Sequence, residues 1–149
     1  ALFTVVLGAA LAAIAVHDFK HYRVPDLLSL LIALSGMLFW LLSSPAALPF
    51  QLLYGFAFGT SLWLMREAHF WLAGRIGLGL GDVKLAAAGA IWLNPVMLPL
   101  LLFIASLTGL VFALATALAH GARLRQIRIA FAPFLGVAIL FCWLVERLP

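Results

Sequence analysis

Long apolar stretches follow one another along this chain, with more polar breaks between most of them. A membrane has a hydrocarbon core about 30 Å thick, which an α-helix crosses with roughly 20 apolar residues and seldom with fewer than about 17. Six stretches approach this length: residues 1–16, 27–42, 49–65, 83–98, 99–119 and 130–145. The sequence therefore predicts an all-α, polytopic membrane protein, a bundle of about six transmembrane helices.

The composition agrees with surroundings that are mostly lipid. Of the 149 residues, 66% are hydrophobic and 9% are charged, whereas a soluble domain carries about 25% charged residues. The length suggests a single membrane-embedded domain over residues 1–149. The few basic residues are divided among short loops, so we expect no nucleic-acid partner. Cys142 is the single cysteine, which excludes an intramolecular disulfide and a paired-cysteine zinc site within this sequence.

Positive charge alternates from one break to the next. With the exception of Arg147, the basic residues fall in the first, third and fifth breaks or, for Lys84, just past the third: Lys20, Arg23, Arg66, Arg75, Lys84, Arg123, Arg125 and Arg128. The connections at residues 43–49 and 94–99, which join the second stretch to the third and the fourth to the fifth, carry no charge. Because short loops rich in Lys and Arg stay in the cytoplasm, the basic breaks are predicted to face the cytoplasm and both termini the opposite side.

Two of the acidic residues are predicted to lie at the same membrane level. Asp18 stands at the cytoplasmic end of the first stretch and Asp82 at that of the fourth. Ionisable groups at membrane depth usually face a bundle interior or a wet cavity. Two carboxylates that meet in a partly desolvated site share one proton. The ionised acid then takes a proton from water while the neutral acid polarises a peptide carbonyl. The pair predicts aspartic protease chemistry.

Each acidic residue also has a simpler interpretation. Asp18 has polar neighbours and could be an ordinary interfacial residue. Asp26 follows Pro25 and precedes an apolar stretch, so it is expected to be a helix cap. Glu67 and Glu146 stand beside arginines at the ends of apolar stretches and are expected to be solvated.

Alternating glycines distinguish Asp82 from a simple cap. Asp82 could cap the helix that follows it, but capping does not require Gly77, Gly79 and Gly81. Glycines allow another backbone to come close, which suits an extended peptide bound beside the acid; a flexible loop or close helix packing is the alternative. Lys84 is expected to extend to the lipid headgroups. Alternatively, it adjusts the pKa of the two acids or contacts an acidic group of the substrate.

The histidines do not form a metal-binding pattern. His17, His21, His69 and His120 are scattered over three breaks, and only the first two have a helical spacing. Pro25 argues against a long helix around that pair. We therefore expect no metal and no cofactor.

The segment Gly79-Leu80-Gly81-Asp82, followed by Val-Lys-Leu, resembles the Gly-x-Gly-Asp motif of the type IV prepilin peptidase family. Residues 12–28, AAIAVHDFKHYRVPDLL, resemble the family's first motif, in which an aspartate precedes a basic stretch and a Pro-Asn or Pro-Asp pair. The resemblance assigns the catalytic acids to Asp18 and Asp82 and a capping position to Asp26.

Residues 129–140, IAFAPFLGVAIL, resemble the family's third motif, usually Ile-Pro-Phe-Gly-Pro-Phe-Leu. The matching residues are Phe131, Pro133, Phe134 and Leu135. Ala130 and Ala132 replace the motif's first proline and its glycine. Neither replacement is expected to touch the two acids.

The resemblance implies a membrane aspartic endopeptidase of the bacterial inner membrane. Such enzymes remove the short basic leader, after a glycine, from type IV prepilin-like, pseudopilin or Flp-type precursors at the cytoplasmic face. Many relatives carry an inserted pair of Cys-x-x-Cys motifs that accompanies N-methylation. With one cysteine, this chain resembles the short, peptidase-only form or the catalytic part of a longer enzyme, and methyltransferase activity is not expected.

Two other functions stay open at this point. Intramembrane proteases of the presenilin kind also use Gly-x-Gly-Asp, but their partner acid usually lies in the middle of a span, whereas Asp18 lies near an end. A small proton-coupled transporter or channel would use paired acids to relay ions. It would need polar groups through the depth of the bundle, and the outer halves of these stretches offer little beyond Ser and Thr.

Overall fold

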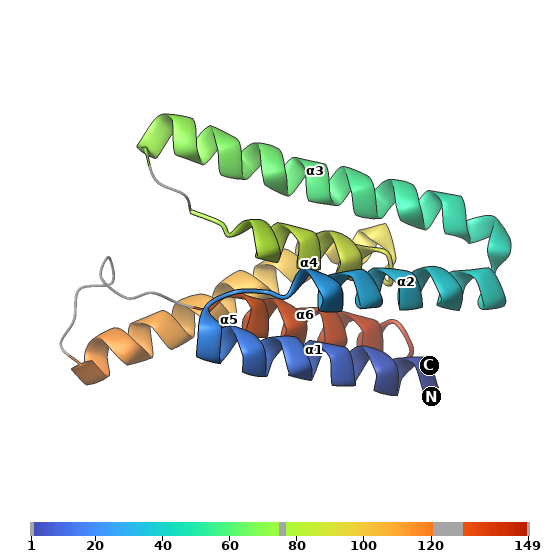
Figure 1. Ribbon diagram of the computed structural model, residues 1–149, viewed down its shortest axis with the longest axis horizontal. Helices are drawn as coiled ribbons and strands as arrows, with labels where there is room; N and C mark the ends of the chain where they lie inside the picture. The colour runs from blue at the N-terminus through green and yellow to red at the C-terminus, as the bar shows by residue number, and fades with distance from the viewer. Residues whose placement is uncertain (1, 75–76, 121–129, 149) are drawn as a thin grey trace.

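The computed structural model describes residues 2–74, 77–120 and 130–148 of the chain. Figure 1 shows these residues as six α-helices packed in an elongated bundle. The elements are α1 (Leu2–His21), α2 (Asp26–Ser43), α3 (Leu48–Ala73), α4 (Leu80–Ala90), α5 (Leu98–His120) and α6 (Ala132–Val145), with 3-10 turns η1 (Pro45–Ala47) and η2 (Pro95–Met97). No β-strand occurs within these described ranges, which confirms the predicted all-α fold.

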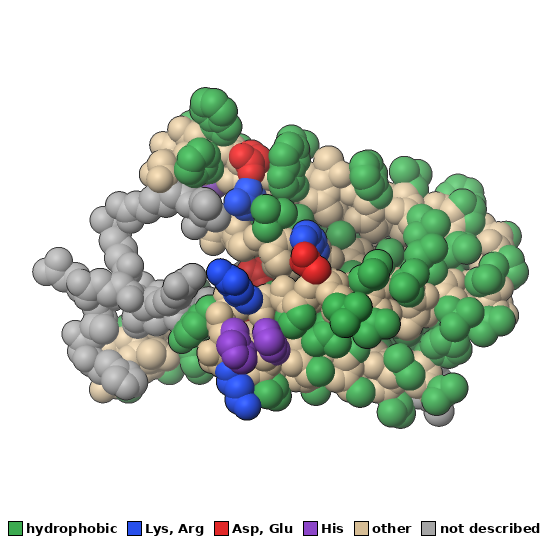
Figure 2. Space-filling view, in the orientation of Figure 1, with side chains coloured by type: hydrophobic (Ala, Val, Ile, Leu, Met, Phe, Trp, Pro, Cys, Tyr) green, Lys and Arg blue, Asp and Glu red, His purple; other side chains and the backbone are tan. Residues whose placement is uncertain are grey.

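The outer surface of the bundle is largely apolar. Leu2–His21, Asp26–Ser43 and Pro95–Ala119 are long and apolar enough to cross a membrane, and Ala132–Val145 is apolar but shorter. On the face shown in Figure 2, hydrophobic side chains cover most of the bundle, while charged and histidine side chains gather toward one end. Soluble proteins rarely expose so wide an apolar surface, so this is the fold of a polytopic membrane protein.

Consecutive helices run in opposite directions along the bundle (Figure 1). The last turns of α1, α3 and α5 lie at the same end as the first turns of α2, α4 and α6. The start of α1 and the end of α6 lie at the other end. The three breaks predicted to be basic therefore join helices at one end. Four of their arginines lie outside the described residues: Arg75, Arg123, Arg125 and Arg128.

Helix α4 lies inside the bundle, where it packs against α2, α3 and α6. Its buried residues are Val83, Leu85, Ala86, Ala88, Gly89 and Ala90. Most of these side chains are small, which lets neighbouring helices approach closely. This packing holds the first turn of α4, and with it Asp82, between the surrounding helices.

Helix α4 is shorter than the predicted stretch 83–98. It ends at Ala90, and the N–H groups of Trp92 and Leu93 make 3-10-type bonds to Gly89 and Ala90. A proline forces the residue before it out of the helical conformation, and Asn94 is indeed extended, with ψ 138°. At about 1.5 Å per residue, the 11-residue helix is about 16 Å long. The prediction of one continuous spanning helix here is wrong.

Helices α1 and α3 are longer than predicted. Helix α1 continues past residue 16 to His21, so Asp18 lies within the last turn of this helix. Helix α3 continues to Ala73 and ends at Gly74 with a left-handed φ of 64°, a common glycine position after a helix C-terminus. Residues 66–73, which follow the predicted stretch 49–65, are thus helical as well.

An aromatic cluster stabilises the packing of the helices at the end of the bundle that lies away from Asp18 and Asp82. The rings of Phe39, Trp92 and Trp143 contact one another, with the two tryptophan centroids 4.9 Å apart. Trp92 Nε1 donates to the Ile32 carbonyl at 2.8 Å, and Trp143 Nε1 donates to Thr4 Oγ1 at 3.1 Å. These bonds satisfy the buried indole N–H groups and tie together helices α1, α2 and α6 and the chain just after α4.

Candidate active site

Asp18 continues the inward-facing side of α1. Leu7, Leu11, Ile14 and Asp18 are the buried residues of this helix, and spacings of three and four place them on one face. Asp18 is 4% exposed. The backbone N–H of Ala132, in the first turn of α6, hydrogen-bonds its carboxylate. Asp18 therefore faces the interior of the bundle and is not an ordinary residue of the membrane interface.

Asp82 lies in the first turn of α4 and reaches back toward the start of that helix. Gly79 is the N-cap residue, and its backbone N–H hydrogen-bonds the Asp82 carboxylate. This is one half of a capping box. A Cβ at Gly79 would lie 3.0 Å from Asp82 Oδ2, so a larger residue would displace the carboxylate. Burial, together with the negative charge of Asp18, raises the pKa of Asp82 to about 6.

The two acids line the same cavity, although they are far apart in the sequence. The cavity has a volume of about 400 Å³. Its other lining residues are Tyr22, Arg23, Val24, Asp26, Gly79, Leu80, Gly81 and Lys84. A pair of carboxyl groups in such a cavity can hold one proton between them and act on a bound water and a peptide carbonyl. The structure thus brings together the two residues that the sequence singled out.

Gly81 permits a close contact within the protein itself. A Cβ at Gly81 would lie 2.8 Å from the Cβ of Val24. The glycine therefore lets the first turn of α4 pack against the segment that joins α1 to α2. This is the packing role that the sequence left open, and it explains the residue without an approaching substrate backbone.

Asp26 and Lys84 form an ion pair that links α2 to α4. Lys84 Nζ and Asp26 Oδ1 are 2.8 Å apart. The expected capping role of Asp26 is wrong, because Pro25 is the N-cap residue of α2 and no side chain caps this helix. Asp26 is already helical and turns its carboxylate to the lysine. Lys84, expected to reach the headgroups, points to the cavity's rim instead.

The third motif touches Asp18 through its backbone. Ala132 begins α6 and Pro133 follows it in the first turn, where a missing proline N–H costs nothing. The first N–H groups of a helix have no partner inside the helix, and that of Ala132 is satisfied by Asp18. The expectation that neither replacement touches the acids is therefore wrong for Ala132. Because the contact is a backbone one, alanine provides it as glycine would.

The remaining acids are bonded and not simply solvated. Glu67 forms an ion pair with Arg66, whose Nε also donates to the Leu78 carbonyl at 3.1 Å. Glu146 accepts a hydrogen bond from the Asn94 N–H at 2.7 Å. Neither glutamate lines the acid cavity. Arg66 thereby helps to fix the chain just before the Gly-x-Gly-Asp segment.

His17 and His21 stack on one another in the last turns of α1, with ring centroids 4.4 Å apart. The expectation of no long helix around this pair is wrong, because the 20-residue helix α1 includes both histidines. Among the described residues, no group of three or more His, Cys, Asp or Glu side chains is placed to hold a metal ion. The side chain of His120 lies outside what the structure describes.

Known proteins resemble this chain over most of its length. The family model described as "Type IV leader peptidase family" matches residues 5–114. The chain is 38% identical over 138 residues to a prepilin leader peptidase/N-methyltransferase of Dickeya chrysanthemi, covering 89% of this chain and 48% of that protein. A protein of the same name from Neisseria gonorrhoeae is 35% identical over 133 residues, covering 89% and 45% of the two chains. No solved structure matches the chain.

The chain spans about half the length of the curated relatives it matches. The family match covers most of α1 to α5 and includes both acids of the cavity. The chain therefore belongs to the type IV leader peptidase family.

Proposed function

We propose that this protein is a membrane aspartic endopeptidase that removes the short basic leader from type IV prepilin-like, pseudopilin or Flp-type precursors. The observation that carries the proposal is the cavity of about 400 Å³ lined by both Asp18 and Asp82. The family's name supplies the leader peptide as substrate. The charge pattern of the sequence supports the cytoplasmic side of the membrane for this end of the bundle.

The reaction follows from a pair of carboxyl groups that holds one proton. The ionised member of the Asp18–Asp82 pair accepts a proton from water, and the oxygen of that water attacks the carbonyl carbon of the scissile bond. The protonated member donates a hydrogen bond to the carbonyl oxygen as it becomes negative. Collapse of the tetrahedral intermediate breaks the C–N bond, and a carboxyl proton passes to the leaving nitrogen. Ala132 and Gly79 position the two carboxylates through backbone N–H groups.

A transporter or channel receives less support from the described residues. Their buried polar or charged side chains are Asp18, Ser29 and Gln51, and Asp18 is the one ionisable group among these three. A proton relay across the bundle would need further titratable groups along its depth. The relatives' shared name also includes N-methyltransferase. We assign only the peptidase activity to residues 1–149, because they lack the paired cysteines that the resemblance associates with methylation.

The test is cleavage of a reporter prepilin in membranes that contain this chain. Asp18→Asn and Asp82→Asn should each lower the cleavage rate about 100-fold or more, since each removes one carboxyl group from the pair. Glu67→Gln is the matched control, because this acid is bonded to Arg66 away from the cavity. It should cleave at the parental rate.

Each variant also needs a check that it inserts and folds, by membrane abundance and melting temperature in detergent. Activity that survives in a folded Asp18→Asn or Asp82→Asn variant would disprove the assignment of the pair. Absence of cleavage by the parent chain, with several prepilin reporters, would disprove the proposed function itself.

A further inference from the structure

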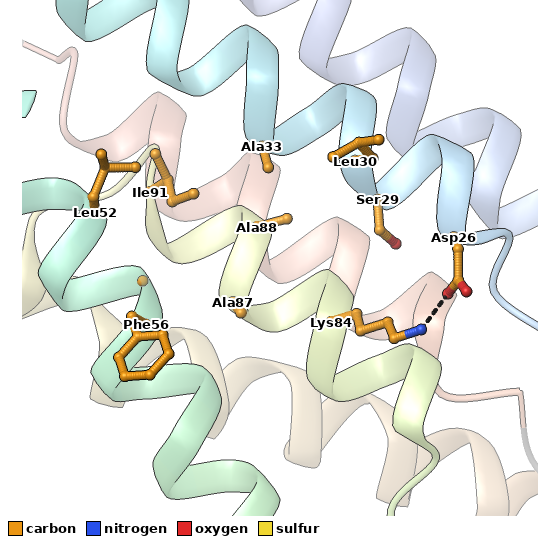
Figure 3. Close-up of a pocket in the computed structure, with 11 residues that line it drawn as sticks. Asp26, Ser29, Leu30, Ala33, Leu52, Phe56, Lys84, Ala87, Ala88 and Ile91 are labelled. Atoms are coloured by element: carbon orange, nitrogen blue, oxygen red, sulfur yellow. Dashed lines mark hydrogen bonds and ion pairs between the residues drawn. The ribbon is translucent and has the colours of Figure 1, made fainter.

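A second hollow lies beside the acid cavity. It is a groove of about 540 Å³ between α2, α3 and α4 (Figure 3). Its walls are mostly apolar, with Leu30 and Ala33 on α2, Leu52 and Phe56 on α3, and Ala88 on α4. Apolar walls of this kind bind apolar segments.

The groove and the acid cavity meet at one ion pair. Asp26 and Lys84 line both hollows, and Figure 3 shows their ion pair at one end of the groove. Both side chains are substantially exposed, at 71% and 49%, so the pair itself contributes little stability. A polypeptide that passes this pair would therefore have one part in the groove and the adjoining part beside Asp18 and Asp82.

Ser29 distinguishes this groove from a surface that only holds lipid. The residue is 5% exposed, and its Oγ has no hydrogen-bond partner. Other helical hydroxyls bond back to their own helix, as Ser35 does to the Leu31 carbonyl at 2.7 Å. Ser29 instead directs its hydroxyl into the space between α2 and α4 (Figure 3). A buried hydroxyl of this kind is costly unless a ligand supplies a partner.

We propose that the groove binds an apolar segment of the substrate polypeptide, on the side of the scissile bond away from the basic leader. This inference rests on the proposed function. A lipid acyl chain fills apolar space but has no group that could bond to Ser29, whereas a peptide backbone offers N–H and C=O groups. The leader is excluded because burying its positive charges among apolar walls is costly. Ser29 lies one helical turn beyond Asp26, so it would meet the substrate close to the scissile bond.

The test compares two synthetic peptides in cleavage assays with the purified full chain. Both contain a basic leader that ends in glycine; one stops a few residues later, and the other continues with about 20 Leu and Ala residues. We expect the parent to cleave the long peptide with the lower KM. Ala33→Phe fills the groove and should lower kcat/KM for the long peptide about tenfold, mainly by raising KM. This is the effect expected when the peptide loses the burial of roughly two methylene groups. Cleavage of the short peptide should not change.

The matched control and a second variant separate binding from folding. Ala12→Phe adds the same side chain at an exposed position of α1 and should cleave both peptides like the parent. Ser29→Ala should lower kcat/KM for the long peptide about fivefold, the loss of one hydrogen bond, while the melting temperature stays equal or rises. A purely structural hydroxyl would give a lower melting temperature and equal effects on both peptides.

The outcomes distinguish the two proposals. If the parent cleaves both peptides but Ala33→Phe and Ser29→Ala leave the long one unaffected, or weaken both peptides equally, the groove holds lipid or nothing and the inference is overturned. If the parent cleaves neither peptide, the proposed function fails, and this inference fails with it.

Discussion

Replacing Gly89 with alanine tests whether α4 is held in place by tight packing against α6. Gly89 is buried, and an added Cβ would meet Cδ1 of Ile139 and lie 2.8 Å from its Cγ1. Ile139 is fully buried, and a β-branched side chain in a helix has one strongly preferred rotamer. Ile139 therefore cannot turn away at low cost.

Two opposing effects determine the change in stability. Alanine favours a helix over glycine by about 1 kcal/mol, whereas an extra methyl group in a filled core costs about 1–3 kcal/mol. Because Ile139 leaves little room for relaxation, we expect a cost near the upper end of that range. The net result is a loss of about 1–2 kcal/mol in the free energy of unfolding, or about 2–8 °C in melting temperature.

The assay is thermal unfolding of the detergent-solubilised protein, followed by prepilin cleavage. Gly8→Ala is the control, because nothing lies within 4 Å of a Cβ at that position; it should be as stable as the parent or slightly more so. Ile139→Val removes Cδ1 and should recover part of the loss when combined with Gly89→Ala. A Gly89→Ala variant more stable than the parent, as helix propensity alone would give, would refute the packing argument.

Three further predictions follow from the site. Cleavage should slow as the pH rises above about 6, because the raised pKa of Asp82 means that the pair loses its shared proton there; a rate that keeps rising with pH would contradict this. Gly81→Ala should lower both melting temperature and cleavage rate, since its Cβ would lie 2.8 Å from that of Val24, and a fall in activity alone would instead favour contact with substrate. A cysteine placed at Ser44 should react with an impermeant thiol reagent from outside the cell, and one at His21 only after permeabilisation; the reverse would place the acids on the wrong side for a cytoplasmic leader.

The apolar stretches and the alternation of charge predicted the number and direction of the helices, but not where they end. Apolar stretches predict a helix correctly where the helix begins and ends close to the ends of the apolar stretch, as in α2 and α5. They do not reveal that α4 ends at Ala90, since Trp92 and Leu93 are as apolar as the helix before them. Nor do they reveal that α1 continues to His21, because a helix tolerates polar residues once it has left the apolar layer.

The two acids could be predicted because each combines charge with a local pattern that requires an explanation. Their backbone partners could not. Ala132 acts through its N–H group, and any residue except proline provides one. The ion pair between Asp26 and Lys84 could not be predicted either, because the two residues are far apart in the sequence. Only the packing of α2 against α4 brings them together.

Asp82 shows why a structural and a catalytic interpretation need not compete. The capping bond from the Gly79 N–H fixes the start of α4 and, by the same contact, aims the carboxylate into the cavity. Such a bond is stronger when the carboxylate is ionised, whereas burial and Asp18 favour the protonated form. These opposing effects leave Asp82 with a proton that it can both hold and release near neutral pH. A Cβ on the N-cap residue would lie 3.0 Å from Asp82 Oδ2 and would shift the carboxylate slightly, so the glycine suits the acid's position even before any substrate is considered.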